Sequence, residues 1–258
     1  MSSPLRKPLI AGNWKMHLTL AQSVALAKEV RDGSQGAAAE VALCVPFTAI
    51  SVVAETLRGS AVRVGAQDLY WESHGAFTGE ISPAQLVDAG CQTVIIAHSE
   101  RRRLFHESDE HVNKKLKAAL AAKLMPILCV GETLEERESH RTFKVLETQL
   151  AGGLAGFAPS DLAPLVIAYE PVWAIGTGKT ATPDQAQEAH LFIRKQLAKL
   201  YSEGLAAGCR ILYGGSVKAD NVDSLMSQPD LDGALVGGDS LKGANFLRIV
   251  KFQAAAAK

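Results

Sequence analysis

The segment Leu165-Val-Ile-Ala-Tyr-Glu-Pro-Val-Trp-Ala-Ile-Gly-Thr-Gly-Lys179 places one carboxylate, that of Glu170, directly after a short apolar run. The run Leu165 to Tyr169 predicts a buried parallel strand, so we expect Glu170 at the carboxyl end of that strand. Pro171 has no N–H to donate and ends the hydrogen bonding of the strand. The residues after it have no consistent period, which predicts a loop.

We interpret this loop as a flap over Glu170. Trp173 and Ile175 are apolar enough to cover a carboxylate, and Gly176 and Gly178 supply a flexible end. A base beneath a closing apolar flap suits chemistry in a site from which water is excluded. An ordinary strand-to-helix loop with a surface Trp is the alternative. The flap comprises Pro171, Val172, Trp173, Ala174, Ile175, Gly176, Thr177, Gly178 and Lys179.

Two nucleotide-binding motifs resemble parts of this segment, and both are rejected. Gly178-Lys-Thr180 resembles the end of a P-loop, but Trp173 stands where that motif requires glycine. Gly176-Thr-Gly-Lys-Thr-Ala181 loosely fits a dinucleotide fingerprint, but its first glycine lies several residues beyond the strand. No strand ending in Asp or Glu follows at the distance that ribose binding needs.

The composition is that of a globular enzyme, with 47% hydrophobic and 21% charged residues. Lys plus Arg balance Asp plus Glu at 27 each, which argues against nucleic-acid or membrane-surface partners. The first residues lack the apolar core of a signal peptide, and no apolar run approaches the roughly 18 residues of a membrane span. We therefore expect a soluble, cytoplasmic enzyme.

The cysteines are spaced too widely for a metal site or a redox motif. We expect them to be small core hydrophobes in a reducing compartment, and we expect neither a metal nor an organic cofactor. They are Cys44, Cys91, Cys129 and Cys209.

Short apolar runs alternate along the whole chain with segments of helical period, which is typical of α/β folds. Eight such units without a linker or composition shift favour a single (β/α)₈ barrel domain over residues 1–258, with eight parallel strands. The runs are Leu9–Ala11, Val41–Val45, Val62–Ala66, Thr93–Ala97, Pro126–Val130, Leu165–Tyr169, Ile211–Tyr213 and Ala234–Val236. The helical segments include Thr133–Leu150 and Pro183–Glu203, the second opened by a capping box at Thr182.

Catalytic residues of such barrels come from the carboxyl ends of several strands. The first strand is followed by Asn13 and Lys15, an amide and a cation that suit an anionic substrate and a developing oxyanion. The fourth strand is followed by His98. If a helix begins at Ser99, its dipole disfavours a charged imidazole, so His98 would remain neutral and donate a hydrogen bond.

The last two strands end in glycine pairs, Gly214-Gly215-Ser216 and Gly237-Gly238. Glycines let backbone N–H groups approach an anion, and the loops after strands seven and eight of barrels frequently form a phosphate site. Gly176 on the flap offers another N–H. Plain tight turns are the alternative for these glycine pairs.

The excursion Asp68 to Ile81 is long, polar and aromatic, and it follows the third strand. Tyr70, Trp71 and Phe77 make it too apolar to stand in water comfortably, so we expect it to dock into another subunit. A loop folded back on its own barrel is the alternative.

These pieces closely resemble the triose-phosphate isomerase family. The matching motifs are Gly12–Lys15, Gly75–Ser82, His98–Arg102, Cys129–Glu132, Tyr169–Lys179 and Tyr213–Val217. The resemblance implies a (β/α)₈ homodimer that interconverts dihydroxyacetone phosphate and glyceraldehyde 3-phosphate in glycolysis and gluconeogenesis. It implies Glu170 as base and His98 as electrophile, aided by Lys15 and Asn13. It also implies dimer contacts through Phe77, Thr78 and Glu80, with Thr78 near the partner's site.

Two positions depart from the family pattern. Ala97 replaces a glycine before His98, which adds a methyl group that we expect to cost little if the strand has room. Asp239 replaces an alanine after Gly237-Gly238, where a carboxylate would repel a phosphate dianion by roughly 4 kcal/mol at 4 Å and intermediate dielectric. We therefore expect its side chain to point outward and cap the final helix.

Two rival functions use the same features. The first is another sugar-phosphate barrel enzyme, such as a Schiff-base aldolase acting through Lys15. The second is a barrel that binds triose phosphates without converting them, or that serves only as an interaction surface.

Overall fold

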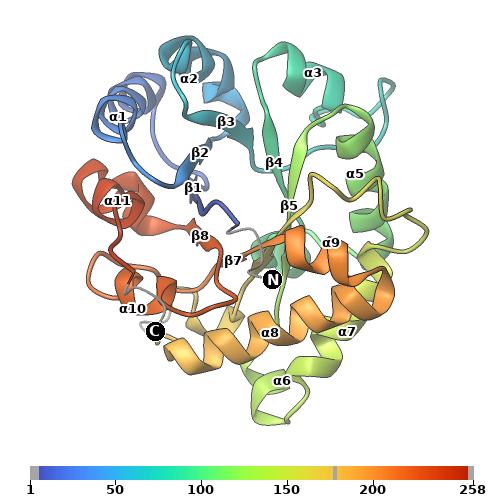
Figure 1. Ribbon diagram of the computed structural model, residues 1–258. Coiled ribbons are helices and arrows are strands. Elements are labelled where there is room, and N and C mark those ends of the chain that lie inside the picture. The colour runs from blue at the N-terminus through green and yellow to red at the C-terminus, as the bar shows by residue number, and fades with distance from the viewer. Residues whose placement is uncertain (1–5, 177–178, 255–258) are drawn as a thin grey trace.

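The computed structural model describes residues 6–176 and 179–254, which form a closed barrel of parallel strands in sequence order, β1 to β8, surrounded by helices (Figure 1). The strand bounds are β1 Leu9–Asn13, β2 Glu40–Cys44, β3 Arg63–Ala66, β4 Thr93–Ile96, β5 Met125–Val130, β6 Val166–Tyr169, β7 Arg210–Tyr213 and β8 Gly233–Val236. The predicted fold class is confirmed. Both ends of each predicted run lie within two residues of the corresponding ends of an observed strand.

The helices cover the outside of the barrel. Their bounds are α1 Leu20–Gly33, α2 Ile50–Leu57, α3 Pro83–Asp88, α4 Ser99–Leu104, α5 Asp109–Ala121, α6 Leu134–Glu138, α7 Thr142–Gly153, α8 Pro183–Leu200, α9 Glu203–Gly208, α10 Val222–Met226 and α11 Gly243–Val250. Three short 3₁₀ segments are η1 Phe47–Ala49, η2 Val172–Ala174 and η3 Gly238–Leu241.

The helix boundaries show which local sequence signals were sufficient to predict where a helix begins or ends. Thr182 caps α8 through the predicted capping box. The single helix predicted over Thr133–Leu150 is wrong, because the chain divides into α6 and α7. His140, between them, has a φ of 56°, which a continuous right-handed helix does not allow.

Alternate strand residues face two different cores, as the two-residue period of a strand requires. The interior of the barrel is filled by Leu9, Ala11, Ala42, Cys44, Ile95, Met125, Ile127, Cys129, Val166, Ala168, Leu212 and Leu235. Their neighbours along the strands, among them Ile10, Leu43 and Ile167, pack against the helices. All four cysteines are buried and unpaired, as expected. The barrel is therefore a solid core, and chemistry must take place at its rim.

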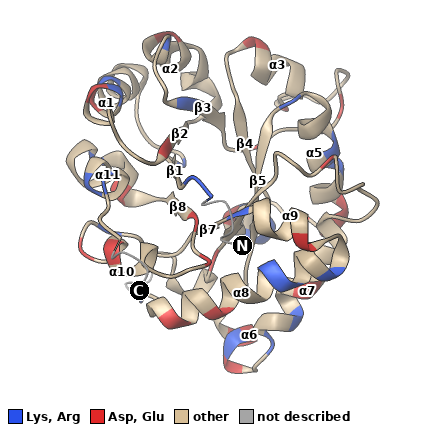
Figure 2. Cartoon of the chain, viewed as in Figure 1, with Lys and Arg blue, Asp and Glu red and all other residues tan. Residues whose placement is uncertain are grey.

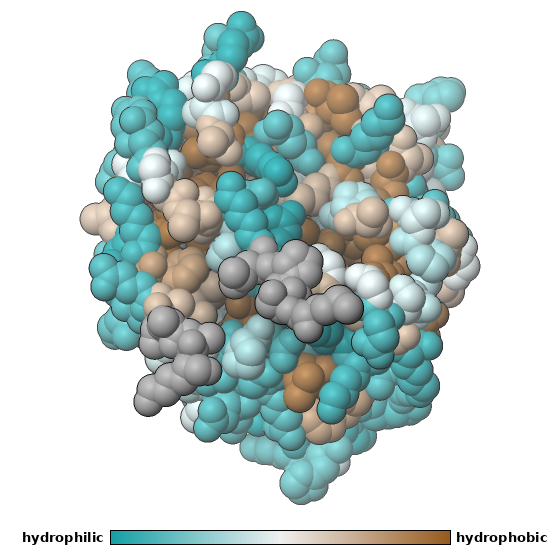
Figure 3. Space-filling model, viewed as in Figure 1, coloured by the Kyte–Doolittle hydropathy of each residue, from teal (hydrophilic) through white to brown (hydrophobic). Residues whose placement is uncertain are grey.

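Charges of both signs are interspersed on the helices around the barrel (Figure 2). Hydrophilic side chains cover most of the face shown in Figure 3, with smaller apolar areas between them. Among the residues described, no helix combines the length and apolar character needed to cross a lipid bilayer.

The barrel closes where β8 pairs with β1, with Leu9 opposite Gly233. Gly233 has a φ of 144°, and a Cβ atom at this position would lie 1.9 Å from the carbonyl oxygen of Leu9. Backbone closure at this seam therefore requires glycine on both conformational and steric grounds.

We expect Gly233→Ala to lower the free energy of unfolding by on the order of 3 kcal/mol, because strain and overlap act together at the seam. Gly208→Ala is the matched control: no atom lies within 4 Å of a Cβ there, and the residue ends α9. The control should change stability by less than about 1 kcal/mol. Urea unfolding followed by circular dichroism at fixed protein concentration checks both, and equal midpoints would contradict the prediction.

Candidate active site

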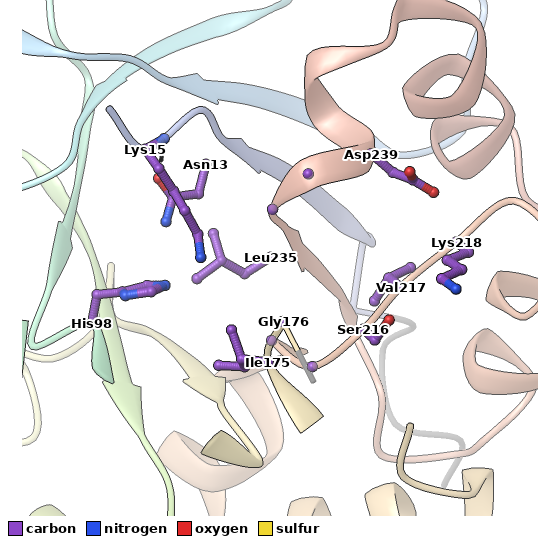
Figure 4. Close-up of a pocket in the computed structure, with 14 residues that line it drawn as sticks. Asn13, Lys15, His98, Ile175, Gly176, Ser216, Val217, Lys218, Leu235 and Asp239 are labelled. Atoms are coloured by element: carbon purple, nitrogen blue, oxygen red, sulfur yellow. Dashed lines mark hydrogen bonds between the residues drawn. The ribbon is translucent and has the colours of Figure 1, made fainter. Parts of the chain in front are cut away.

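A cavity of about 250 Å³ opens at the carboxyl ends of β1, β4, β6, β7 and β8 (Figure 4). Polar residues from distant parts of the chain meet in its wall, as the barrel topology predicts. It is lined by Asn13, Lys15, His98, Ile175, Gly176, Gly214, Gly215, Ser216, Val217, Lys218, Leu235, Gly237, Gly238 and Asp239.

The end of β1 presents a cation and an amide to the cavity. The N–H of Lys15 donates to Asn13 Oδ1 at 3.0 Å, which leaves the amide nitrogen of Asn13 as the end of that side chain able to donate to a ligand. Lys15 has a φ of 52°, and Gln67 Nε2 donates to its carbonyl oxygen at 2.9 Å. Lys15 Nζ lies 2.5 Å from Glu100 Oε1, so the two side chains form an ion pair.

His98 occupies the turn between β4 and α4. Helix α4 begins at Ser99, as the sequence analysis required, and His98 is its N-cap. Its Nδ1 accepts a hydrogen bond from the N–H of Glu100 at 3.2 Å. A nitrogen that accepts carries no proton, so this contact favours the neutral tautomer protonated at Nε2.

Glu170 lies beside His98, but it is not among the residues that line this cavity. Its Oε2 accepts from the N–H of Ser99 at 2.8 Å, and its Oε1 lies 2.9 Å from His98 Nε2. The side chain is only 2% exposed, and Oε1 makes no well-aligned hydrogen bond within the described part of the chain. A second cavity of about 280 Å³, lined by Cys129 and Arg102, lies on the other side of this carboxylate.

Opposing effects act on the pKa of His98. Burial lowers it, whereas the carboxylates of Glu170 and Glu100 raise it, and Lys15 lowers it again. The net pKa is raised, against the expectation drawn from the helix dipole alone. The cause is the position of Glu170, whose carboxylate touches the imidazole in this conformation.

The first residues of the flap are anchored at one buried carboxylate. Glu132 Oε1 accepts hydrogen bonds from Trp173 Nε1 at 2.9 Å and from Tyr169 Oη at 3.1 Å. Arg137 donates to the same oxygen at 3.2 Å and stacks over the Trp173 ring. Trp173 therefore packs onto the molecule through a specific polar contact.

The far end of the flap is glycine where the backbone requires it. Gly176 has a φ of 70°, a conformation that favours glycine, and it lines the cavity together with Ile175. Two of the flap residues in the predicted set, Thr177 and Gly178, lie outside the described residues.

The loops after β7 and β8 bring backbone donors to the opposite wall. No turn, loop or cap hydrogen bond between described residues uses the N–H of Ser216, Gly237 or Gly238. A Cβ atom on Gly237 would lie 3.6 Å from Lys15 Cε, so the lysine side chain reaches from β1 to the glycines after β8. Backbone N–H groups without such a partner, in the same cavity wall as a lysine, fit an oxyanion ligand.

Comparison with known proteins agrees with this geometry. The family model of triosephosphate isomerase matches residues 8–253. A triosephosphate isomerase from Pelobacter propionicus is 56% identical over 252 residues, which cover 96% of this chain and 100% of the relative. One from Trichlorobacter lovleyi is 56% identical over 250 residues, with 96% and 100% coverage.

The chain belongs to the triosephosphate isomerase family.

A solved structure supports the assignment. The crystal structure of triosephosphate isomerase from Bartonella henselae superposes with a TM-score of 0.85 at 40% identity, covering 94% of this chain and 97% of that one. The chain is thus an intramolecular aldose–ketose isomerase that interconverts dihydroxyacetone phosphate and glyceraldehyde 3-phosphate, a reaction of glycolysis. The assignment therefore rejects both alternative functions, the Schiff-base aldolase and the barrel that does not convert triose phosphates.

The two departures from the family pattern behave differently from expectation. Ala97 has a φ of 63°, so relative to glycine it carries backbone strain of about 1–2 kcal/mol. Asp239 does not cap α11 in the described structure, because the N-cap is Lys242 without a side-chain cap. Asp239 Oδ1 instead accepts from Asn245 Nδ2 at 3.3 Å.

The predicted dimer-contact residues stand apart from the cavity of their own chain. Phe77, Thr78 and Glu80 are exposed at the tip of the 68–81 loop, which is closed at its base by the N–H of Tyr70 donating to the Ile81 carbonyl at 2.9 Å. The Tyr70 ring stacks on Trp71 and packs against Phe77.

Several residues of the site escaped the sequence analysis. In the sequence, Leu235 resembles any other residue of a strand, and Lys218 resembles an ordinary charged residue of the surface. The donor role of the Ser99 backbone is invisible because every residue type has an N–H. Glu132 belongs to the motif Cys129–Glu132, and its position directly after β5 predicts a role at the rim of the barrel.

A second buried histidine, His190, provides a comparison for the pKa of His98. His190, on α8, is fully buried against Tyr169 and Tyr213, and its Nδ1 lies 3.2 Å from the carbonyl oxygen of Asp230. Burial lowers the pKa of His190 to about 3. This side chain is a neutral structural group behind β6 and β7.

The lowered pKa of His190 predicts an acid sensitivity. Stability from a buried neutral imidazole is present above the unfolded pKa of about 6.5 and is lost as the pH falls toward 3, by up to about 5 kcal/mol. We expect His190→Leu to flatten the decline of unfolding free energy between about pH 6.5 and 5. His140→Asn, at an exposed site, should retain the wild-type decline. Urea titrations at several pH values test this, and parallel curves for wild type and His190→Leu would refute it.

Proposed function

We propose that Glu170 is the base of the isomerisation and that His98, Lys15 and Asn13 stabilise the enediolate. The base takes a proton from the carbon next to the carbonyl group and returns it to the neighbouring carbon. One carboxylate suffices, because both carbons lie within reach of a single group. The observation that supports this best is the 2.9 Å contact between Glu170 Oε1 and His98 Nε2, beside the cavity.

Glu170 must move to act. It lies against Ser99 and is absent from the described cavity wall, so substrate binding has to draw its carboxylate away from the Ser99 N–H. A single charge-assisted hydrogen bond of roughly 1.5–3 kcal/mol holds it there. Binding energy from the phosphate group is large enough to release it.

His98 and Lys15 have separate tasks toward the substrate oxygens. The Nε2–H of His98 donates to an oxygen that becomes negative, while the Lys15 ammonium supplies positive charge. A neutral histidine electrophile beside a glutamate base is the established pattern of this family, and the accepted hydrogen bond at Nδ1 agrees with it. The contact of the Lys15 Nζ with Glu100 disfavours a Schiff base at this nitrogen.

We assign the substrate phosphate to the N–H groups of Gly176, Ser216, Gly237 and Gly238. They come from the flap and from the loops after β7 and β8, so flap closure and phosphate binding are coupled. A closed flap also excludes water, which suppresses loss of phosphate from the enediolate.

We propose that two chains form a homodimer through the 68–81 loop. The loop exposes Phe77 at its tip. Another cavity of about 490 Å³, next to the cavity of the candidate active site, has an apolar rim that includes Met16 and Phe105. Met16 is 94% exposed and Phe105 is 62% exposed, which is unfavourable in water. Because Lys15 and His98 line the same cavity, a partner loop seated there would bring its Thr78 close to the catalytic groups.

We expect Glu170→Asp to lower kcat on the order of 100-fold, because the shorter side chain withdraws the carboxylate by about 1 Å. Thermal unfolding should stay close to wild type. Glu135→Asp, at an exposed position of α6, is the matched control and should retain full activity. A coupled isomerase assay measures both, and near-normal turnover of Glu170→Asp would remove this residue from the role of base.

We expect deletion of residues 73–79 to yield monomers with strongly reduced kcat, since the partner loop no longer covers the Lys15 side of the site. Leu200→Asp on α8, at a position 42% exposed, should leave the assembly unchanged. Sedimentation velocity combined with the activity assay checks this prediction. An unchanged sedimentation coefficient for the deletion variant would contradict the proposed dimer contact.

A further inference from the structure

Two charged side chains of opposite sign line the phosphate side of the cavity. Lys218 follows β7, and Asp239 lies in η3 after β8. Figure 4 shows the Asp239 carboxylate directed away from Lys15 and His98, toward the side of the cavity on which Lys218 lies. Both charges flank the N–H groups of Ser216 and Gly238.

Neither charge is neutralised by an ion pair among the described residues. Asp239 Oδ1 accepts a hydrogen bond from Asn245, and the backbone N–H of Lys218 donates to Asn221. By contrast, the ammonium of Lys15 is held by Glu100 at 2.5 Å. The charges of Lys218 and Asp239 therefore both contribute to the electrostatic potential at the proposed phosphate position.

We propose that Lys218 and Asp239 set the affinity for the substrate phosphate by opposing long-range electrostatic effects. Lys218 attracts the dianion, and Asp239 repels it and thereby favours product release. This inference rests on the phosphate site proposed above. Both residues act on binding and not on the reacting carbons, which lie on the His98 side of the cavity.

The charge of Asp239 is separable from its structural contact. Asp239→Asn keeps an oxygen that accepts from Asn245 but carries no charge. Lys218→Gln keeps much of the side-chain length, and the hydrogen bond from its backbone to Asn221 is independent of the side chain. The two substitutions therefore change the field with little change of shape.

The experiment measures KM, kcat and competitive inhibition by inorganic phosphate. We expect Asp239→Asn to lower KM and the phosphate inhibition constant on the order of 5-fold, and Lys218→Gln to raise both by a similar factor. The double variant should return near wild type. In each case kcat should change by less than about 2-fold, because the reacting groups are untouched.

Three controls separate electrostatics from structure. The differences should shrink as ionic strength rises from about 0.05 M to about 0.5 M, since screening weakens both effects. Turnover of glyceraldehyde without phosphate should be the same in all variants. Asp161→Asn, in an exposed loop before the amino end of β6, should leave every constant unchanged.

Each outcome bears on one proposal. Unchanged phosphate inhibition in both single variants overturns the inference, as does a higher KM for Asp239→Asn, which would indicate a structural role. Gly238→Pro distinguishes the levels, because it removes one of the assigned N–H groups at the first residue of η3, where no atom lies within 4 Å of a Cβ. If Gly238→Pro weakens phosphate inhibition while the charge variants do not, only this inference fails. If all three variants leave it unchanged, the proposed phosphate site itself is wrong.

Discussion

The hydrogen bond from the Ser99 N–H to Glu170 Oε2 is the interaction on which the arrangement of the site depends. A carboxylate buried to this degree would be costly without donors, by several kcal/mol. The first turn of α4 supplies the donor, and its dipole favours the negative charge. Because His98 caps the same turn, one helix end fixes both groups relative to each other. The ends of β4 and β6 are thereby joined across β5, which lies between them in the barrel.

The backbone is strained beside the groups that need exact orientation. Lys15 and Ala97 have φ angles of 52° and 63°, each costing on the order of 1–2 kcal/mol. Gln67 holds the first by binding the Lys15 carbonyl, and the start of α4 holds the second. The strained positions are Lys15 itself and the residue directly before His98, and the side chains of Lys15 and His98 both line the cavity. A rigid barrel core makes such local cost tolerable.

The alternation of apolar runs was enough to predict the barrel, and the residues after the runs were enough to predict part of its cavity wall, including Asn13, Lys15 and His98 but not Lys218. Both succeed because a parallel strand has one carboxyl end, and sequence position determines what lies there. Contacts made through space were not predictable. The pairing of Lys15 with Glu100 and the outward contact of Asp239 with Asn245 depend on angles between elements.

The resting position of Glu170 also bears on how His98 works. While the carboxylate touches Nε2, it is the chief influence that raises the pKa of His98. In the proposed mechanism, movement of Glu170 toward the substrate would remove much of that influence, whereas burial and Lys15, which both lower the pKa of His98, would remain. The proposed electrophile would then become more firmly neutral as it donates from Nε2 to the enediolate. In this proposal a single side-chain motion delivers the base and sets the protonation state of His98.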